Sequence, residues 1–216
     1  MLTLVTGGAR SGKSRFAQSL CPRDGVVFVA TARAEDEEMR RRIEHHRRTR
    51  PAEWLTIEEP LALARAVRSA LLRADTLLID CLTLWLSNLM WEGRESSAEE
   101  VEARALAEVD ELADCGAGLS SPGLIVVSNE VGGGIVPETE TGRRFRDLQG
   151  LVNQRCAARA DRVFLTVAGI AIPIKLEGTD SDIHHRGAET QRNANFKSKS
   201  KPEGAEGTES AEPREG

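Results

Sequence analysis

The stretch Gly7-Gly8-Ala9-Arg10-Ser11-Gly12-Lys13-Ser14 decides the fold of this chain. It has the pattern G-x-x-x-x-G-K-[ST], it follows the apolar run 2–6, and a helix-like segment, 15–20, comes after it. A strand, this pattern and a helix in succession are the context in which a P-loop binds nucleotide phosphates. A glycine-rich turn without a ligand is the alternative, and the flanking strand and helix argue against it.

Each fixed position of the loop has a physical role in phosphate binding. Glycines let the backbone turn so that successive N–H groups point inward, and the helix N-terminus adds the positive end of its dipole. The Lys13 ammonium then reaches the β- and γ-phosphates, and the Ser14 hydroxyl is a ligand for Mg²⁺. The sequence therefore predicts chemistry on a nucleoside triphosphate.

Strand-like and helix-like segments alternate along the chain. Apolar runs typical of buried parallel strands lie at 26–31, 76–80, 124–128 and 162–168, and we expect the last of these to be the final strand. Charge and apolar periodicity predict helices at 34–50, 60–73, 97–116 (opened by a Ser97–Glu100 capping box) and 141–160, while 82–90 is apolar enough for core or a subunit contact. This alternation predicts a single α/β domain like that of P-loop NTPases, with a mostly parallel sheet flanked by helices.

A carboxylate, Asp80, ends the apolar run 76–80. In P-loop proteins an acid in this position, the Walker B position, holds Mg²⁺ or its water opposite the P-loop hydroxyl. An apolar strand that ends in Asp is common, so the prediction depends on the presence of Ser14. Together the two residues predict a magnesium site.

Two adjacent histidines lie in the segment Arg42-Ile43-Glu44-His45-His46-Arg47-Arg48-Thr49-Arg50-Pro51. Neighbours on a helix point about 100° apart, so we expect one of the two to meet a ligand directly. The surrounding arginines favour neutral imidazole and attract phosphate oxygens. Such an imidazole can be a nucleophile toward an α-phosphate, a general base, or a hydrogen-bonding residue of the surface.

A second glycine-rich segment, 129–138, follows the apolar run 124–128. Three consecutive glycines, 132–134, mark a flexible or tightly turned loop. Ligands of open α/β sheets bind at the carboxyl ends of the strands, so we expect this loop to form a wall of the active site. A long turn without a function is the alternative.

Composition bounds the remaining possibilities. The 216 residues carry 29 Lys and Arg against 34 Asp and Glu, a net charge of −5, which gives no basic field for nucleic acid. No apolar run approaches the length of a membrane span, and the four scattered cysteines suggest buried free thiols, so we expect a cytoplasmic protein. We expect the catalytic domain to span 1–175 and a disordered tail, poor in large apolar residues, to span 176–216.

Several motifs together resemble one enzyme family. They are T-G-G-A-R-S-G-K-S at 6–14, A-T-A-R at 30–33, R-I-E-H-H-R-R-T-R-P at 42–51, D-C-L-T at 80–83 and S-N-E-V-G-G-G-I-V-P-E at 128–138. This set is similar to that of the bifunctional adenosylcobinamide kinase / adenosylcobinamide-phosphate guanylyltransferase family of cobalamin biosynthesis. The resemblance spans about residues 1–175 and is more specific than the P-loop alone.

The resemblance implies two reactions and their site residues. A nucleoside triphosphate, ATP or GTP, phosphorylates the aminopropanol hydroxyl of adenosylcobinamide; GTP then guanylylates a histidine with loss of pyrophosphate, and the GMP passes to adenosylcobinamide phosphate. The first histidine of the pair, His45, would be the nucleophile, with His46 beside the guanylate and Lys13 also catalytic. Nucleotide contacts would be Gly7, Gly8, Ala9, Arg10, Ser11, Gly12, Lys13, Ser14, Thr31, Ala32, Arg33, His46, Arg47, Arg48, Thr49, Glu58 and Asp80, with Mg²⁺ on Ser14 and Asp80. The family also implies a homotrimer.

Two departures and two alternatives remain. Asp80 stands where family members can carry Glu, and the tail after 175 exceeds the usual family length. One alternative is a P-loop kinase of another small alcohol, in which the histidines are structural. The other is a nucleotide-dependent regulatory binding protein. Neither alternative requires the His-His-Arg segment or the second glycine loop.

Overall fold

The computed structural model describes residues 1–34, 36–48 and 50–176, without the side chains of Arg42 and His45. The predicted tail lies almost wholly outside these residues, so both its disorder and the domain boundary stay predictions. Among the described helices, none has the length and apolar character needed to cross a membrane.

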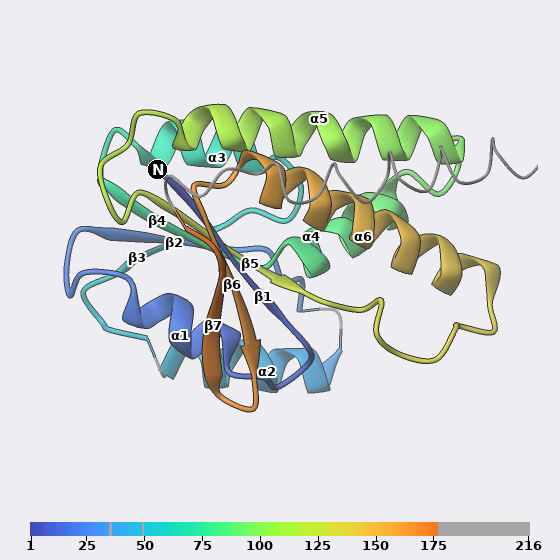
Figure 1. Ribbon diagram of the computed structural model, residues 1–216, viewed down its shortest axis with the longest axis horizontal. Helices are drawn as coiled ribbons and strands as arrows, with labels where there is room; N and C mark the ends of the chain where they lie inside the picture. Colours follow the sequence, from blue (N-terminus) through green and yellow to red (C-terminus); the bar gives the residue numbers. More distant parts are fainter. Residues whose placement is uncertain (35, 49, 177–216) are drawn as a thin grey trace, which may run out of the picture. The chain divides into compact units, whose positions relative to one another are not determined.

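One sheet of seven strands organises the described residues (Figure 1). The strands are β1 (Leu2–Gly7), β2 (Val26–Ala30), β3 (Leu55–Glu58), β4 (Thr76–Asp80), β5 (Leu124–Asn129), β6 (Arg162–Val167) and β7 (Ile170–Lys175). Their order is β3-β2-β4-β5-β1-β6-β7, and every neighbouring pair is parallel except β6 and β7. The predicted α/β fold with a mostly parallel sheet is therefore confirmed.

Helices cover both faces of this sheet. They are α1 (Lys13–Ser19), α2 (Glu37–Arg48), α3 (Leu63–Ala70), α4 (Leu82–Glu92), α5 (Ala98–Gly116) and α6 (Glu140–Arg159). In Figure 1 α3, α5 and α6 lie above the sheet, and α1 and α2 lie below it. Trp85 of α4 is fully buried and donates its indole N–H to the Leu61 carbonyl at 2.8 Å, so the expectation of a core role for this segment is confirmed.

The core has two layers because side chains alternate across each strand. In β4, Leu77 and Ile79 pack with α3 to α6, while Leu78 packs on the α1 side. In β5, Leu124 and Val126 face the first layer and Ile125 and Val127 the second. This double burial explains why the inner strands are continuous apolar runs.

Two strands were missed by the sequence analysis, and two helices are shorter than expected. The expectation that 162–168 is the last strand is wrong, because β7 follows it and pairs with it antiparallel. The short edge strand β3 was not predicted at all. The helix expected at 34–50 spans Glu37–Arg48, since the Asp36 carboxylate accepts from the Met39 N–H at 2.6 Å. The helix expected at 60–73 spans Leu63–Ala70, and the Glu59 carboxylate accepts from the N–H groups of residues 61 and 62, both at 2.9 Å.

The predicted capping box opens α5. Ser97 Oγ accepts from the Glu100 N–H at 3.1 Å, and the Glu100 carboxylate accepts from the Ser97 N–H at 2.9 Å. We expect Ser97→Ala to lower the free energy of unfolding by about 1 kcal/mol. Urea titration measures this loss, and Ser96→Ala, at an exposed position just outside the box, is the matched control. Equal stability of the two variants would contradict the assigned cap.

Candidate active site

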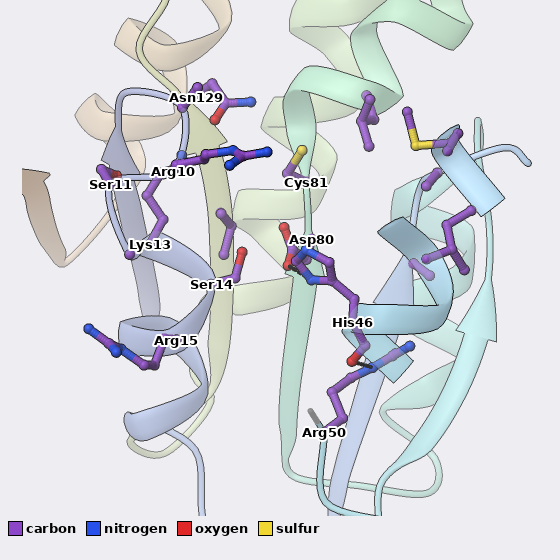
Figure 2. Close-up of a pocket in the computed structure, with 18 of the residues that line it drawn as sticks. Arg10, Ser11, Lys13, Ser14, Arg15, His46, Arg50, Asp80, Cys81 and Asn129 are labelled. Atoms are coloured by element: carbon purple, nitrogen blue, oxygen red, sulfur yellow. Dashed lines mark hydrogen bonds and ion pairs between the residues drawn. The ribbon is translucent and has the colours of Figure 1, made fainter. Parts of the chain in front are cut away.

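The carboxyl ends of β1, β2, β4 and β5 meet at a cavity of about 1100 Å³ (Figure 2). The P-loop forms one wall, α2 forms the opposite wall, and the ends of β4 and β5 lie between them. Asp80 ends β4 and Asn129 ends β5. This is the place where open parallel sheets bind ligands.

The P-loop is braced by the β6–β7 hairpin. Gly7 has φ +152°, and a Cβ there would lie 2.3 Å from the Thr166 carbonyl oxygen, so this position requires glycine. Ser11 Oγ lies 2.8 Å from Thr166 Oγ1, and the Gly169 N–H donates to the Ser11 carbonyl at 2.9 Å. These contacts fix the shape of the loop before any phosphate binds.

Lys13, the first residue of α1, extends back along the P-loop. Its Nζ donates to the Gly8 carbonyl at 2.8 Å, where the loop begins. Burial lowers the pKa of its ammonium, while Cys81 and Asp80 act in the opposite direction. The cation is thus held inside the cavity with the Asp80 carboxylate nearby.

The Ser14 hydroxyl and the Asp80 carboxylate lie close to each other in the cavity (Figure 2). Burial raises the pKa of the Asp80 carboxyl, while Ser14, His46, Lys13 and Arg50 act against this rise. Thr31 stabilises the adjoining backbone, since its buried hydroxyl donates to the Cys81 carbonyl and accepts from the Cys81 N–H, both at 2.8 Å. The acid therefore occupies a fixed position.

The face of α2 that lines this cavity carries Met39, Ile43 and His46, at helical spacing. His46 Nδ1 lies 3.9 Å from Asp80 Oδ2. Arg50, just beyond the helix, donates from Nε to the His46 carbonyl at 3.1 Å and stacks 3.9 Å above the Phe28 ring. The backbone of His45 belongs to α2, and its side chain lies outside the described residues.

A smaller cavity of about 370 Å³ adjoins another face of α2. Arg47 and Glu58 form an ion pair on its wall, and Arg40 and Glu44 also line it. Ala32 and Ile43 line both cavities. The two hollows therefore meet along one edge of α2.

The structure brings together most of the predicted site residues that it describes. Those on the larger cavity are Ala9, Arg10, Ser11, Gly12, Lys13, Ser14, Ala32, His46 and Asp80, and those on the smaller one are Ala32, Arg47 and Glu58. Five predicted residues do not line either cavity: Gly7, Gly8, Thr31, Arg33 and Arg48. The Thr31 side chain is fully buried, and Arg48 pairs with Glu44 at 2.5 Å. Thr49 lies outside the described residues.

Some lining residues were not predicted as site residues. Arg15, Arg50 and Asn129 are the polar examples with the clearest positions in Figure 2. Asn129 had a positional signal, since it ends an apolar strand beside the P-loop strand. In the segment 129–138, Asn129 alone is among the lining residues, and Ile135 is 97% exposed, so the expected wall is reduced to its first residue.

The donor groups of the cavity fit a small hard cation bound together with a triphosphate. Ser14 and Asp80 offer a hydroxyl and a carboxylate oxygen, the ligand type that Mg²⁺ prefers, and Mg²⁺ usually takes few protein ligands beside phosphates and water. Within the described residues no group of three or more His, Cys, Asp or Glu could hold a metal.

The four cysteines are free, two of them buried and two half-buried, and burial raises the pKa of Cys81 to about 11.

Comparison with known proteins identifies the family. A family model described as cobinamide kinase / cobinamide phosphate guanyltransferase matches residues 3–174. The chain is 47% identical over 180 residues to the bifunctional adenosylcobalamin biosynthesis protein CobP of Pseudomonas aeruginosa, covering 82% of this chain and 99% of that protein. It is 41% identical to CobU of Salmonella typhimurium over 181 residues and to CobU of Escherichia coli over 184, in each case covering 81% of this chain and 100% of the relative. The chain therefore belongs to the cobinamide kinase / cobinamide phosphate guanyltransferase family and is a bifunctional, nucleotide-using enzyme of cobalamin biosynthesis.

Proposed function

We propose that both reactions of this enzyme use one triphosphate site, the cavity between the P-loop and α2. The observation that carries the proposal is the convergence of Lys13, Ser14, His46 and Asp80 on that cavity. A kinase reaction alone needs Lys13, Ser14 and Asp80 but not His46. The addition of the histidine-bearing helix supports a second reaction at another phosphorus of the same nucleotide.

In the guanylylation step we propose His45 as the nucleophile. Its imidazole nitrogen forms a bond to the α-phosphorus of GTP, the bond from that phosphorus to the α–β bridging oxygen breaks, and pyrophosphate leaves. The guanylyl group then passes to the phosphate of adenosylcobinamide phosphate and frees the histidine. Covalent catalysis divides one difficult transfer into two easier ones, and the cations at the cavity stabilise charge on the phosphorus oxygens.

In the kinase step the aminopropanol hydroxyl of adenosylcobinamide attacks the γ-phosphorus of ATP or GTP. The new bond forms as the bond from that phosphorus to the β–γ bridging oxygen breaks, the nucleoside diphosphate leaves, and the hydroxyl proton passes to solvent. Lys13 holds the β- and γ-phosphate oxygens. Ser14 and Asp80 would hold Mg²⁺, which supplies charge neutralisation on the phosphates.

The free thiols support a reducing compartment, and we propose the cytoplasm.

Incubation of the purified protein with α-³²P GTP and Mg²⁺, followed by denaturation, tests this proposal. We expect label to stay on the protein through a bond that acid breaks and base leaves intact, as a phosphoramidate on histidine does. Release of the label by cobinamide phosphate would show transfer to the second substrate. A folded protein that phosphorylates cobinamide but takes up no label would contradict the covalent step.

We propose that the chain forms a homotrimer through β7. The edge strand β7 exposes Ile170, Ile172 and Ile174 on one face, with 67%, 46% and 59% of each residue accessible. Three isoleucines in a row at a sheet edge are costly to leave in water and typical of an interface.

Ile172→Asp should therefore shift the mass in solution from trimer toward monomer, measured by light scattering after size exclusion. A charge placed in a buried apolar contact strongly disfavours association. Leu72→Asp is the matched control, because Leu72 is 88% exposed in the turn that follows α3, outside β7. A trimer that survives the first substitution would exclude β7 as the contact.

A further inference from the structure

The side chain of Asn129 enters the active-site cavity from the middle of the sheet. Its strand, β5, lies between β1, which carries the P-loop, and β4, which carries Asp80. Asn129 pairs in register with Gly7, the last residue of β1. Figure 2 shows its amide close to Arg10 at the P-loop end of the cavity.

The backbone of Asn129 is fixed on both sides, whereas its side chain is available. Its N–H donates to Thr83 Oγ1 of α4 at 2.8 Å, and its carbonyl accepts from Asn153 Nδ2 of α6 at 2.9 Å. Asn153 is itself buried and bonded to Ser128 Oγ at 2.6 Å and to Gln149 Nε2 at 2.9 Å. Among the residues that the structure describes, none makes a hydrogen bond to the Asn129 side-chain amide. The molecule thus holds a rigidly placed carboxamide whose donor and acceptor are left for a ligand.

The position of Lys13 shows which part of the triphosphate reaches Asn129. The Lys13 ammonium binds at the Gly8 carbonyl, one residue beyond the partner of Asn129 in β1. The P-loop lysine contacts the β- and γ-phosphates. We therefore expect the γ-phosphoryl group at the end of the cavity where Asn129 lies.

We propose that Asn129 is a catalytic residue of the kinase reaction and is dispensable for guanylylation. Its amide N–H donates to an oxygen of the γ-phosphoryl group, and its amide carbonyl accepts from the attacking hydroxyl, which orients the substrate oxygen toward the γ-phosphorus. The amide takes up no proton; the hydroxyl proton leaves to solvent as the nucleoside diphosphate departs. In guanylylation the bond breaks at the α-phosphorus, and the β- and γ-phosphates leave together, so a contact to the γ-phosphoryl group adds little.

This inference rests on the proposed function, and one pair of assays distinguishes a failure of the inference from a failure of the proposed function. Transfer from γ-³²P GTP to cobinamide measures the kinase reaction, and uptake of α-³²P GTP by the protein without cobinamide measures guanylylation. We expect Asn129→Ala to lower kinase turnover by roughly 10²-fold, the usual effect of removing one polar contact to the reacting group. Guanylylation should stay near the wild-type rate.

Ser14→Ala is the matched control, because the P-loop hydroxyl serves the triphosphate in both reactions and its loss should lower both. A thermal melting curve checks that Asn129→Ala is folded. Equal loss of the two activities in folded Asn129→Ala, or loss of neither, would overturn the inference while the wild type still performs both reactions. A wild type that performs neither would instead refute the proposed function, and the inference with it.

Discussion

His45→Ala should abolish the guanylyl label on the protein while phosphorylation of cobinamide continues. Removing a covalent nucleophile typically lowers turnover by roughly 10⁴-fold or more. The kinase reaction should persist because its phosphate-binding groups, Lys13, Ser14 and Asp80, belong to the P-loop and β4. Rapid-quench labelling with α-³²P GTP, beside a γ-phosphate transfer assay, measures the two activities on the same preparation.

His46→Ala is the informative partner variant. His46 lies 3.9 Å from the carboxylate of Asp80, so it acts on the group that we assign to Mg²⁺. We expect this variant to be labelled more slowly and to retain a stable guanylyl adduct. His184→Ala, which removes a histidine of the C-terminal tail, controls for unspecific labelling. Loss of label in His46→Ala with full labelling of His45→Ala would exchange the roles of the two histidines.

The sequence was sufficient for the parts of the fold that depend on strong local signals. The P-loop has a recognisable sequence pattern. The strands β1, β2, β4 and β5 could be predicted because burial on both faces of the sheet requires continuous apolar runs. The capping box of α5 is equally local. Asp80 could be placed opposite Ser14 because parallel strands bring their carboxyl ends to one edge.

The two missed strands lack such signals. β3 has four residues, Leu-Thr-Ile-Glu, and lies at the sheet edge, where one side needs no apolar partner. β7 contains Pro173, which argues against a strand, although an edge strand tolerates it. The turn before β7 places Ala168 and Gly169 at φ 51° and 85°, a geometry usually signalled by Asn-Gly.

The site residues that sequence reasoning missed come from tertiary packing. Arg50 follows the end of α2 and reaches the cavity because it stacks on Phe28 of β2, a contact between segments far apart in the chain. Arg15 lies in the first turn of α1, beside Gly169, and lines the cavity from there. No spacing rule links such pairs. Cavity-lining arginines of this kind can be identified only when the order of the strands in the sheet is known.

Asp80→Asn should lower both activities and at the same time stabilise the protein. The carboxylate is the acid that we assign to Mg²⁺ and the triphosphate, so both turnovers should fall by roughly 10² to 10³-fold. The stability gain follows from the pKa of Asp80, which burial raises in the folded protein. A raised pKa means that the folded state favours the protonated acid, so the ionised form costs stability above that pKa.

A neutral amide of the same shape removes that cost. The free energy of unfolding, measured by urea titration in EDTA, should therefore be higher for Asp80→Asn than for wild type at pH 7. The difference should shrink as the pH falls and should vanish below the ordinary carboxyl pKa of about 3.9, where Asp80 is protonated in both folded and unfolded states. Asp75→Asn, at an exposed position just before the same strand, should change neither activity nor stability. If Asp80→Asn is less stable than wild type at pH 7, the carboxylate stabilises the fold and the prediction is wrong. If the variant is more stable and inactive, the enzyme retains a destabilising buried charge because its chemistry requires it.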